Sequence, residues 1–300
     1  MSVIQCQNVT RSYGKLKAID NLSFAIEENK LTGLIGRNGA GKTTLLKLLA
    51  GYLKPTSGEI EVFSQKPFNN LEGSSKTMFV NDTMTFPDSF TLIDILSEVA
   101  PFYANWNSNL AKGLLDYFSI NPKQPHSKLS KGSKSTFNSI LGIASRCPLT
   151  IFDEPTSGMD SAVRKDFYKA LLKDYLEYPR SIILSSHLIN EVEGILEDIL
   201  LLNQGVKSLH LPVLELKKFA IGLRGNAQVI QRFVEGKELI YQEEFAKGYL
   251  YVVLRSELIQ PELKLVRQSG LDVLSISTDD LCIYLTAKSR GGIDYVFKRS

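Results

Sequence analysis

The chain has 300 residues, 43% of them hydrophobic, and a formal net charge of +3 spread over 35 basic and 32 acidic residues. That length suits one large domain with a smaller one, and so dispersed a charge does not indicate binding to nucleic acid or anionic lipid. The N-terminus lacks a secretion signal, no window approaches the roughly eighteen apolar residues of a membrane helix, and the scattered Cys6, Cys147 and Cys282 suit free thiols in a reducing compartment. We therefore expect a protein that stays inside the cell and has no membrane span of its own.

A glycine-rich segment lies between an apolar run, Leu31–Ile35, and a segment of helical composition, Leu45–Leu49. Glycines let a backbone wrap closely around phosphate oxygens, and the following helix offers unpaired N–H groups and a positive dipole end. Lys42 is expected to reach the β- and γ-phosphates of a nucleoside triphosphate, and Thr43 to ligand Mg²⁺. The residues expected to hold the nucleotide here are Gly36, Arg37, Asn38, Gly39, Ala40, Gly41, Lys42, Thr43 and Thr44.

Residues 1 to about 80 are predicted to form short strands with hairpin turns, and residues from about 82 to 146 to be rich in helix. The aromatic cluster Phe102–Asn107 is interpreted first as core packing. Apolar residues at helical spacing predict a helix over residues 133–145, so that Ser130 and Gly132 lie at or just before its N-terminus, an end that attracts anions.

Two acidic residues follow the next apolar run, Leu149–Phe152, which is typical of a strand buried in a parallel sheet. Carboxylates at that edge of the sheet lie beside the phosphates of a bound nucleotide. Asp153 is expected to hold Mg²⁺, and Glu154 to accept a proton from the attacking water.

In order and spacing, five segments resemble the Walker A loop, signature, Walker B strand, D-loop and switch histidine of the ATP-binding cassette (ABC) ATPases. They are Gly36–Thr43, Leu129–Ser133, Leu149–Glu154, Ser157–Asp160 and His187. The resemblance covers about residues 1–205 and implies an α/β P-loop core with an N-terminal antiparallel β subdomain and a helical subdomain. It also implies hydrolysis of ATP with Mg²⁺, and His187 as the residue that contacts the γ-phosphate and holds the water.

The same resemblance implies that two cassettes enclose two ATP molecules, with Ser130, Gly132 and the D-loop residue Asp160 contacting nucleotide at the shared interface. The signature departs from the commonest form at Lys131 and Ser133. Lys131 would either add positive charge near the γ-phosphate or be a solvated surface residue.

The remaining candidates are an aromatic residue near the N-terminus, a polar pair at positions 81 and 82, and two histidines. Tyr13 is either the platform on which adenine stacks or a turn aromatic that packs on the first hairpin. Asn81, with Asp82 as its competitor, takes the position of the family's metal-contacting glutamine. His126 and His210 are interpreted as surface or structural residues.

The segments Phe102–Asn107 and Leu129–Gly132 also resemble the YtrB-like branch of bacterial ABC ATPases, whose members partner ABC-2 type membrane subunits in export or resistance to antimicrobial compounds. The resemblance implies a multi-span membrane partner, a second ABC subunit, a cytoplasmic location on the inner face of the membrane and no nucleic acid. A groove lined by residues from about 81 to 102 would receive the membrane subunit, with Phe86 and Phe90 either contacting it or packing the subdomain. A soluble cassette that acts on ribosomes or nucleic acid, and a catalytically idle binding module, are the alternatives.

The cassette is expected to end near residue 205, where Gln204 and Gly205 form a turn, and residues 206–300 to form a small α+β domain. Its predicted elements follow the split-βαβ order and cover residues 219–223, 227–234, 238–241, 249–255, 262–268 and 272–277, with a closing helix over 279–287. This domain would cover the cassette edge, regulate activity or stabilise a dimer, and the fold alone does not decide among these roles.

Overall fold

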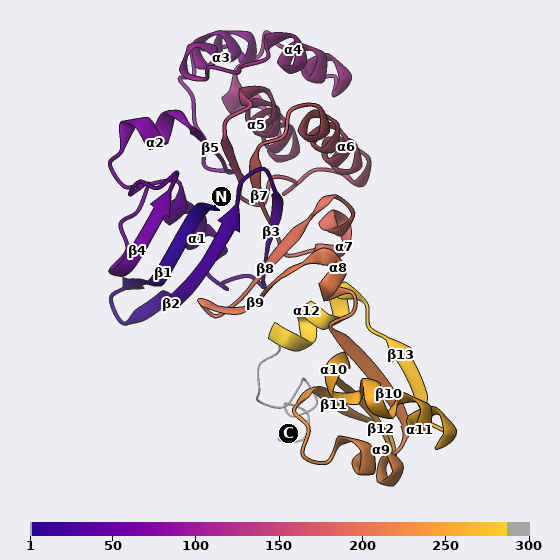
Figure 1. Ribbon diagram of the computed structural model, residues 1–300. Coiled ribbons are helices and arrows are strands. Elements are labelled where there is room, and N and C mark those ends of the chain that lie inside the picture. The colour runs from indigo at the N-terminus through magenta and orange to yellow at the C-terminus, as the bar shows by residue number, and fades with distance from the viewer. Residues whose placement is uncertain (1, 287–300) are drawn as a thin grey trace, which may run out of the picture. The chain divides into compact units, whose positions relative to one another are not determined.

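The computed structural model describes residues 2–286 of the chain (Figure 1). The chain divides into two compact units, Met1–His210 and Leu211–Ser300. The first unit runs past residue 205 because β9 (Val206–Pro212) joins its sheet, after the turn that was correctly predicted at Gln204 and Gly205. Within residues 2–286, none of the helices combines the length and the apolarity that crossing a bilayer requires.

An antiparallel sheet with the order β2-β1-β4 opens the first unit. Its strands are β1 (Ser2–Tyr13), β2 (Leu16–Glu27) and β4 (Ser57–Val62). The antiparallel subdomain was predicted correctly, but the expectation of short strands was wrong for β1 and β2, which have 12 residues each. Register shifts interrupt the β1–β2 pairing, so the apolar alternation breaks along the sequence although the strands continue.

A six-stranded sheet with the order β5-β6-β7-β3-β8-β9 forms the centre of the unit. Its first five strands are β5 (Thr77–Val80), β6 (Leu149–Phe152), β7 (Ser181–Ser186), β3 (Leu31–Ile35) and β8 (Asp198–Asn203). These five pair in parallel, and β3, β6 and β7 are buried along their whole length. The segments that follow these three strands therefore emerge at one edge of the sheet, where open α/β sheets bind their ligands.

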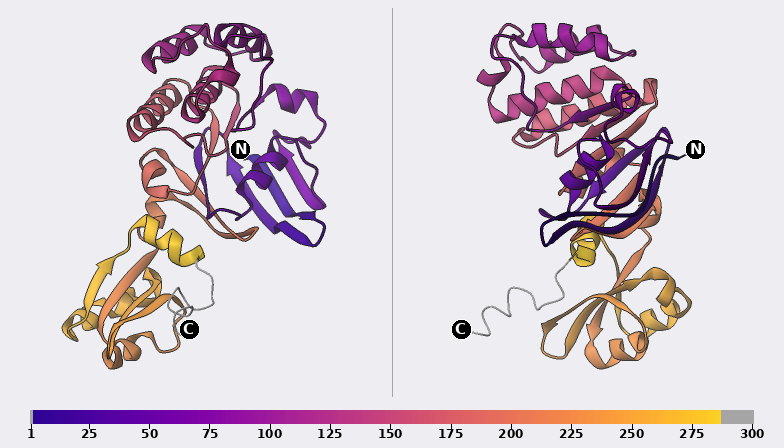
Figure 2. Two further views of the ribbon diagram at one scale, coloured as in Figure 1. Left: turned by 180° about the vertical axis from the view of Figure 1, so that it is seen from behind. Right: turned by 90° about the vertical axis from the view of Figure 1, so that its left-hand side faces the viewer.

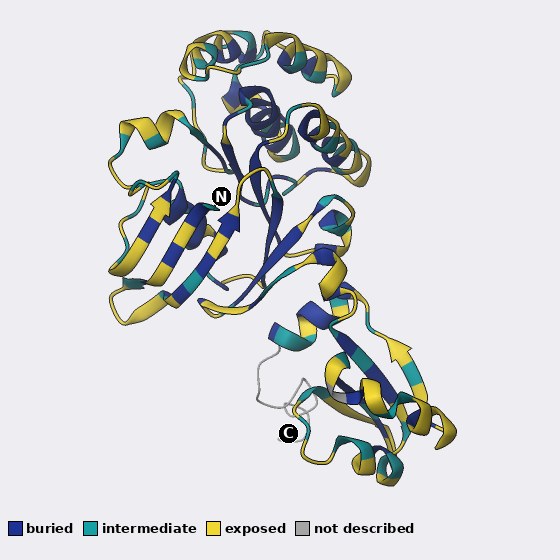
Figure 3. Cartoon of the chain, in the orientation of Figure 1, coloured by how far each residue is buried: buried dark blue, intermediate teal, exposed yellow. Residues whose placement is uncertain are grey.

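The α-helices of the first unit are α1 (Lys42–Leu49), α2 (Leu71–Ser75), α3 (Leu92–Val99), α4 (Ser108–Tyr117), α5 (Lys131–Ser145), α6 (Ser161–Glu177) and α7 (Ile189–Val192). In Figures 1 and 2, α3 and α4 lie away from this sheet, at the top of each view. Leucines of α1 share one apolar core with the three-stranded sheet and with β3, β6, β7 and β8. Figure 3 shows α5 buried beyond its first turn, whereas α4 is largely exposed and α3 buries one face through Leu92, Ile95 and Leu96.

The aromatic cluster in the helical region is not a core cluster. Phe102 is 73% exposed, so the core-packing interpretation is wrong for this residue. Tyr103 is half-buried and its hydroxyl donates to Met78 Sδ at 3.0 Å, while Trp106 Nε1 donates to Ser108 Oγ at 3.0 Å. The cluster therefore presents apolar surface to solvent beside a few local contacts.

The structural interpretation of His126 is confirmed, and that of His210 agrees with its contacts. His126 is buried with its Nε2 at 2.9 Å from Asn138 Oδ1, and burial lowers the pKa of its imidazole. His210 Nε2 lies 3.4 Å from Asp198 Oδ2. Burial raises the pKa of the Cys6 and Cys147 thiols to about 12, so both are core residues rather than nucleophiles.

The second unit has an antiparallel sheet with the order β11-β12-β10-β13. Its elements are α8 (Val213–Leu216), β10 (Ala220–Asn226), α9 (Ala227–Val234), β11 (Leu239–Ala246), β12 (Tyr249–Arg255), α10 (Ser256–Ile259), α11 (Leu263–Gln268), β13 (Asp272–Ser275) and α12 (Thr278–Thr286). The split-βαβ prediction is confirmed. Strand β11 extends beyond the predicted end at residue 241. The prediction was too short because β11 is an edge strand, and its exposed, charged residues do not show the usual alternation of apolar and polar residues. The predicted closing helix corresponds to α12, and residue 287 lies outside the described residues.

Candidate active site

A cavity of about 740 Å³ opens at the edge of the central sheet where β3, β6 and β7 end. The phosphate loop and the start of α1 contribute residues 38–44, β6 is followed by Asp153 and Glu154, and β7 is followed by His187. The structure thus brings three separate predicted motifs to one cavity.

The phosphate loop owes its conformation to Gly41. This residue has φ +103°, and a Cβ on it would lie 2.4 Å from the carbonyl oxygen of Ala18, so no other residue fits. It also caps α1, whose first residue is Lys42. The unpaired N–H groups of this helix end therefore lie at the cavity, as binding of phosphate requires.

Lys42 and His187 hold the two carboxylate oxygens of Glu154. Lys42 Nζ lies 3.1 Å from Oε1, and His187 Nδ1 lies 2.8 Å from Oε2. A carboxylate only accepts, so Nδ1 of His187 is the donor. Lys42 is buried and also donates to the Gly36 carbonyl at 2.6 Å. The candidate base is therefore held through both of its carboxylate oxygens.

Asp153 is buried between two hydroxyl groups. Burial raises the pKa of its carboxyl, and hydrogen bonds from Thr43 and Ser185 oppose that rise. The Ser185 hydroxyl donates to Asp153 Oδ1 at 2.9 Å. A carboxylate hydrogen-bonded to a hydroxyl at a phosphate loop is an all-oxygen donor pair, and Mg²⁺ is commonly held by one carboxylate together with water and substrate phosphates. Thr43 and Asp153 therefore fit this ion.

Tyr13 lies outside the lining of the cavity. It ends β1 and is 45% exposed, and the guanidinium carbon of Arg11 lies 4.9 Å from the centre of its ring. Its partner across the hairpin, Leu16, lines the cavity together with Lys17 and Ala18. Sequence reasoning missed these three residues because a hairpin tip carries no motif.

Asn81 does not turn its amide toward the cavity. Its Oδ1 accepts hydrogen bonds from the Thr83 backbone N–H at 2.8 Å and from the Thr83 hydroxyl at 2.6 Å. Asp82 lines the cavity instead. Of the two alternatives from the sequence, the structure therefore favours Asp82, because the Asn81 side chain is already used in a local turn.

The predicted signature and D-loop contacts Ser130, Gly132 and Asp160 also lie outside the cavity lining. Ser130 is the N-cap of α5 and accepts from the Ser133 N–H at 3.2 Å. Asp160 is the N-cap of α6 and accepts from two backbone N–H groups at 2.9 Å. The two motifs touch each other, since a Cβ on Gly132 would lie 2.4 Å from the Gly158 carbonyl oxygen and Ser135 Oγ donates to the Ser157 carbonyl at 2.7 Å.

Two other lining residues were not predicted for the site, Ser157 and Gln204. Ser157 opens the D-loop segment and Gln204 belongs to the predicted turn, but neither position has a side chain whose chemistry would single it out. Ser185, which lies behind the cavity, likewise has no sequence feature that would indicate a role in the site.

Comparison with known proteins identifies the family. The sequence profile described as ABC transporter matches residues 19–157. An uncharacterized ABC transporter ATP-binding protein of Methanocaldococcus jannaschii is 30% identical over 244 residues, which cover 80% of this chain and 88% of that protein. The chain belongs to the ABC transporter family.

Other relatives of this ABC protein extend the match. The bacitracin transport ATP-binding protein BcrA of Bacillus licheniformis is 27% identical over 305 residues, covering 97% of this chain and 98% of BcrA. The ABC transporter ATP-binding protein YtrB of Bacillus subtilis is 28% identical over 205 residues, covering 65% of this chain and 69% of YtrB. The match to BcrA thus includes both units of the chain.

The fold agrees with solved cassettes. A dimeric ATP-binding cassette in a post-hydrolysis state, bound to ADP and Pi, superposes with a TM-score of 0.61 and 21% identity, covering 70% of this chain and 98% of that one. The predicted α/β cassette fold is therefore confirmed, and the family match above confirms the resemblance to the ABC proteins. The roles of the individual site residues remain predictions.

Proposed function

We propose that this ABC ATPase forms a dimer around ATP and powers a separate ABC-2 type membrane subunit, to which it binds on the inner face of the membrane. The observation that carries the proposal is the preformed group of Lys42, Glu154 and His187 at the end of the central sheet. A binding module without catalysis has no need for a carboxylate held at both oxygens.

The geometry supports a specific course of hydrolysis. The phosphates of ATP compete with Glu154 for Lys42, since both are anions within reach of the same ammonium group. Transfer of Lys42 to the phosphates releases Oε1 of Glu154 to accept a proton from the attacking water, while His187 keeps the carboxylate oriented through Oε2. Bound Mg²⁺, held at Thr43 and Asp153, would neutralise charge on the phosphates.

The need for a second copy follows from where the signature lies. Ser130 and the start of α5 offer backbone N–H groups to an anion, yet they do not border the cavity of their own chain. A second cassette that faces this helix end would complete the shell around the γ-phosphate. The relative bound to ADP and Pi is dimeric, which supports this arrangement.

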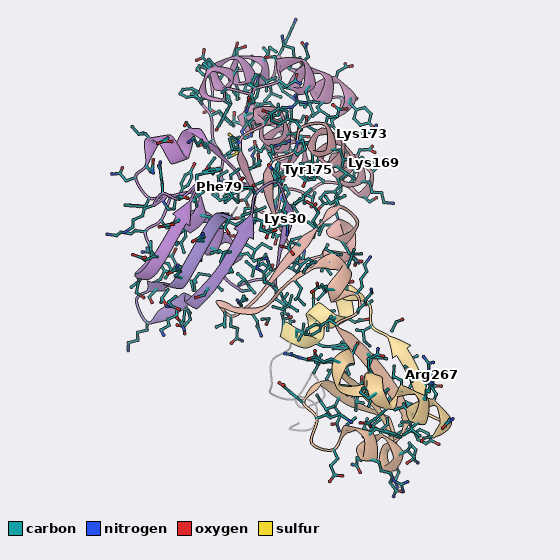
Figure 4. All side chains as sticks on the ribbon, viewed as in Figure 1. Lys30, Phe79, Lys169, Lys173, Tyr175 and Arg267 are labelled. Atoms are coloured by element: carbon teal, nitrogen blue, oxygen red, sulfur yellow. The ribbon has the colours of Figure 1, made fainter. Side chains whose placement is uncertain are left out.

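A groove of about 680 Å³ on the first unit is the proposed docking site for the membrane subunit. It is lined by Tyr52, Phe79 (labelled in Figure 4), Phe86, Val99 and Tyr103 among others. Phe86 is compatible with both alternatives considered from the sequence, since it lines the groove and also packs edge-on against His126 at 5.0 Å between ring centres. Phe90 does not line the groove. Tyr52, outside the predicted range, is 66% exposed there.

Co-purification tests the docking proposal with a matched pair of variants. Tyr52→Ser and Leu176→Ser each remove an exposed apolar side chain, 66% and 69% exposed respectively, but only Tyr52 lies in the groove. We expect Tyr52→Ser alone to lose a multi-span membrane protein from detergent extracts, with basal ATPase activity unchanged in both. Co-sedimentation of the wild-type chain with ribosomes or nucleic acid, without such a partner, would instead support the soluble-factor alternative.

The transported substrate is proposed by analogy alone. BcrA is described by its function in bacitracin transport, so export of a peptide antibiotic or another small antimicrobial compound is the substrate class that we propose for the complex. Bacitracin susceptibility of cells that lack the chain, compared with cells that carry Glu154→Gln, would test it.

A further inference from the structure

The hydroxyl group of Ser185 connects the two acidic residues of the site. Ser185 is the fifth residue of β7 and is completely buried. Its Oγ accepts a hydrogen bond from the Glu154 backbone N–H at 2.9 Å and donates one to Asp153 Oδ1 at 2.9 Å. One hydroxyl thus contacts the main chain of the candidate base and the side chain of the candidate Mg²⁺ ligand.

The hydrogen bond to Glu154 is needed because the parallel ladder ends two residues before it. Strands β6 and β7 are paired in register up to Phe152 and Leu184. Glu154 has φ +49°, in the left-handed region that non-glycine residues rarely adopt. The Glu154 N–H thus lies beyond the ladder, and the Ser185 hydroxyl supplies its acceptor in place of a backbone carbonyl.

We propose that Ser185 is a positioning residue for ATP hydrolysis, which holds Glu154 in its left-handed conformation and fixes the orientation of the Asp153 carboxylate. The inference rests on the proposed roles of these two acids. The left-handed turn brings Oε1 and Oε2 of Glu154 to Lys42 and His187. Without Ser185, nothing else among the described contacts holds the Glu154 N–H, so the carboxylate would sample positions away from the water.

A nearby hydroxyl provides the contrast. Thr150 lies on β6, is also completely buried, and its Oγ1 has no hydrogen-bond partner among the described residues. Both hydroxyls belong to adjacent strands of the same sheet. If removing the Ser185 hydroxyl changes activity more than removing the Thr150 hydroxyl, the cause is therefore the hydrogen bonds of Ser185 and not the loss of a polar atom from the core.

The experiment compares Ser185→Ala with Thr150→Val in the full chain. We expect Ser185→Ala to lower kcat by about 10- to 100-fold, the cost of a misplaced catalytic group, with KM for ATP changed by less than about twofold because the phosphate-loop contacts remain. The Mg²⁺ concentration that half-saturates binding of a fluorescent ATP analogue should rise. Thr150→Val should match the wild type in all three measurements.

Amide hydrogen exchange gives a readout that does not depend on turnover. In Ser185→Ala, exchange of the Glu154 N–H should be at least about tenfold faster than in the wild type, because its acceptor is gone. Glu154→Gln is measured in parallel. If Glu154→Gln is inactive while Ser185→Ala keeps wild-type kcat and Glu154 protection, the role of Ser185 is refuted; if Glu154→Gln itself turns over normally, the proposed function fails first.

Discussion

The nucleotide cavity and the signature helix end belong to the same unit but differ in how far they are complete. At the cavity, both acidic side chains have partners. Lys42 and His187 contact the carboxylate of Glu154, and the hydroxyl groups of Ser185 and Thr43 form hydrogen bonds to Asp153. At the signature, Ser130 caps α5 and the D-loop packs beside it, yet no residue of the motif borders the cavity. In the proposed function, the first region supplies the catalytic groups, and the second is a surface that would bind nucleotide held by a second chain.

The largest effect is expected from Glu154→Gln, which keeps the shape of the side chain but removes the proton acceptor. Turnover should fall by about 10²- to 10⁴-fold, the usual value of general-base catalysis. ATP binding should persist or tighten, because Lys42 loses its ionic partner, and a stable ATP-bound dimer should accumulate. Steady-state turnover and size-exclusion chromatography with ATP check this, and wild-type turnover would reject Glu154 as the base.

Ser130→Arg tests the incomplete region. It should bind ATP almost normally but lose about 10²-fold or more of its turnover, because an Arg at the helix end displaces the donors meant for the second nucleotide. Mixing it with Lys42→Ala protein should restore at most one composite site per heterodimer. Full turnover by Ser130→Arg at concentrations where it is monomeric would contradict the division between the two regions.

Lys42→Ala should weaken ATP binding by about 10- to 100-fold, the range for a lost charged hydrogen bond. Lys47→Ala is the control, since Lys47 lies on the same helix but outside the cavity lining. Equilibrium titration with a fluorescent ATP analogue measures both. Equal affinities in folded proteins would mean that the loop does not hold the phosphates.

Gly132→Ala should destabilise the fold by about 1–3 kcal/mol, since its Cβ would lie 2.4 Å from the Gly158 carbonyl and the backbone would have to shift. Gly113→Ala is the matched helical control. Its Cβ would meet nothing within 4 Å, so alanine should stabilise α4 by about 0.5–1 kcal/mol. The free energy of unfolding of both variants, measured in urea, distinguishes the effect of the D-loop contact from that of helix propensity. Equal changes in this free energy would contradict a close D-loop contact at Gly132.

The smallest effect concerns Tyr13. If adenine stacks on its ring, Tyr13→Ala should lower ATP affinity by about 3- to 10-fold, whereas Tyr13→Phe, which keeps the ring, should not. Identical affinities for the two variants would favour Leu16, the neighbour that lines the cavity, as the adenine contact.

The placement of the candidate catalytic residues at one cavity could be predicted from the sequence because each lies in a contiguous motif. The loop before α1, the acids after β6 and the histidine after β7 are each marked by an apolar strand and a change of residue type. The hydroxyl of Ser185 could not be predicted in this way, because its role depends on the left-handed turn at Glu154 and on strand order. Asn81 shows the same limit, since only local geometry reveals that Thr83 takes its side-chain oxygen.

The secondary structure could be predicted where apolar residues recur at a regular spacing, and less well where that spacing is interrupted. The split-βαβ order of the second unit emerged from short apolar segments, but the length of β11 did not, since its exposed half resembles a polar loop. The exposure of Phe102 could not be predicted from the sequence either, because an aromatic residue can lie in a core or on an exposed surface.

In the proposed dimer, the contact between α5 and the D-loop would couple the two nucleotide sites. Ser135 is tied to Ser157, and Ser157 borders the chain's own cavity, whereas the start of α5 is expected to face the nucleotide of the second chain. A displacement of Ser157 when ATP is hydrolysed at one site would therefore move α5, the helix whose N-terminus is expected to contact the nucleotide of the other site. A pair of such subunits should show positive cooperativity in ATP, with a Hill coefficient above one that falls toward one when Ser135 is replaced by Ala.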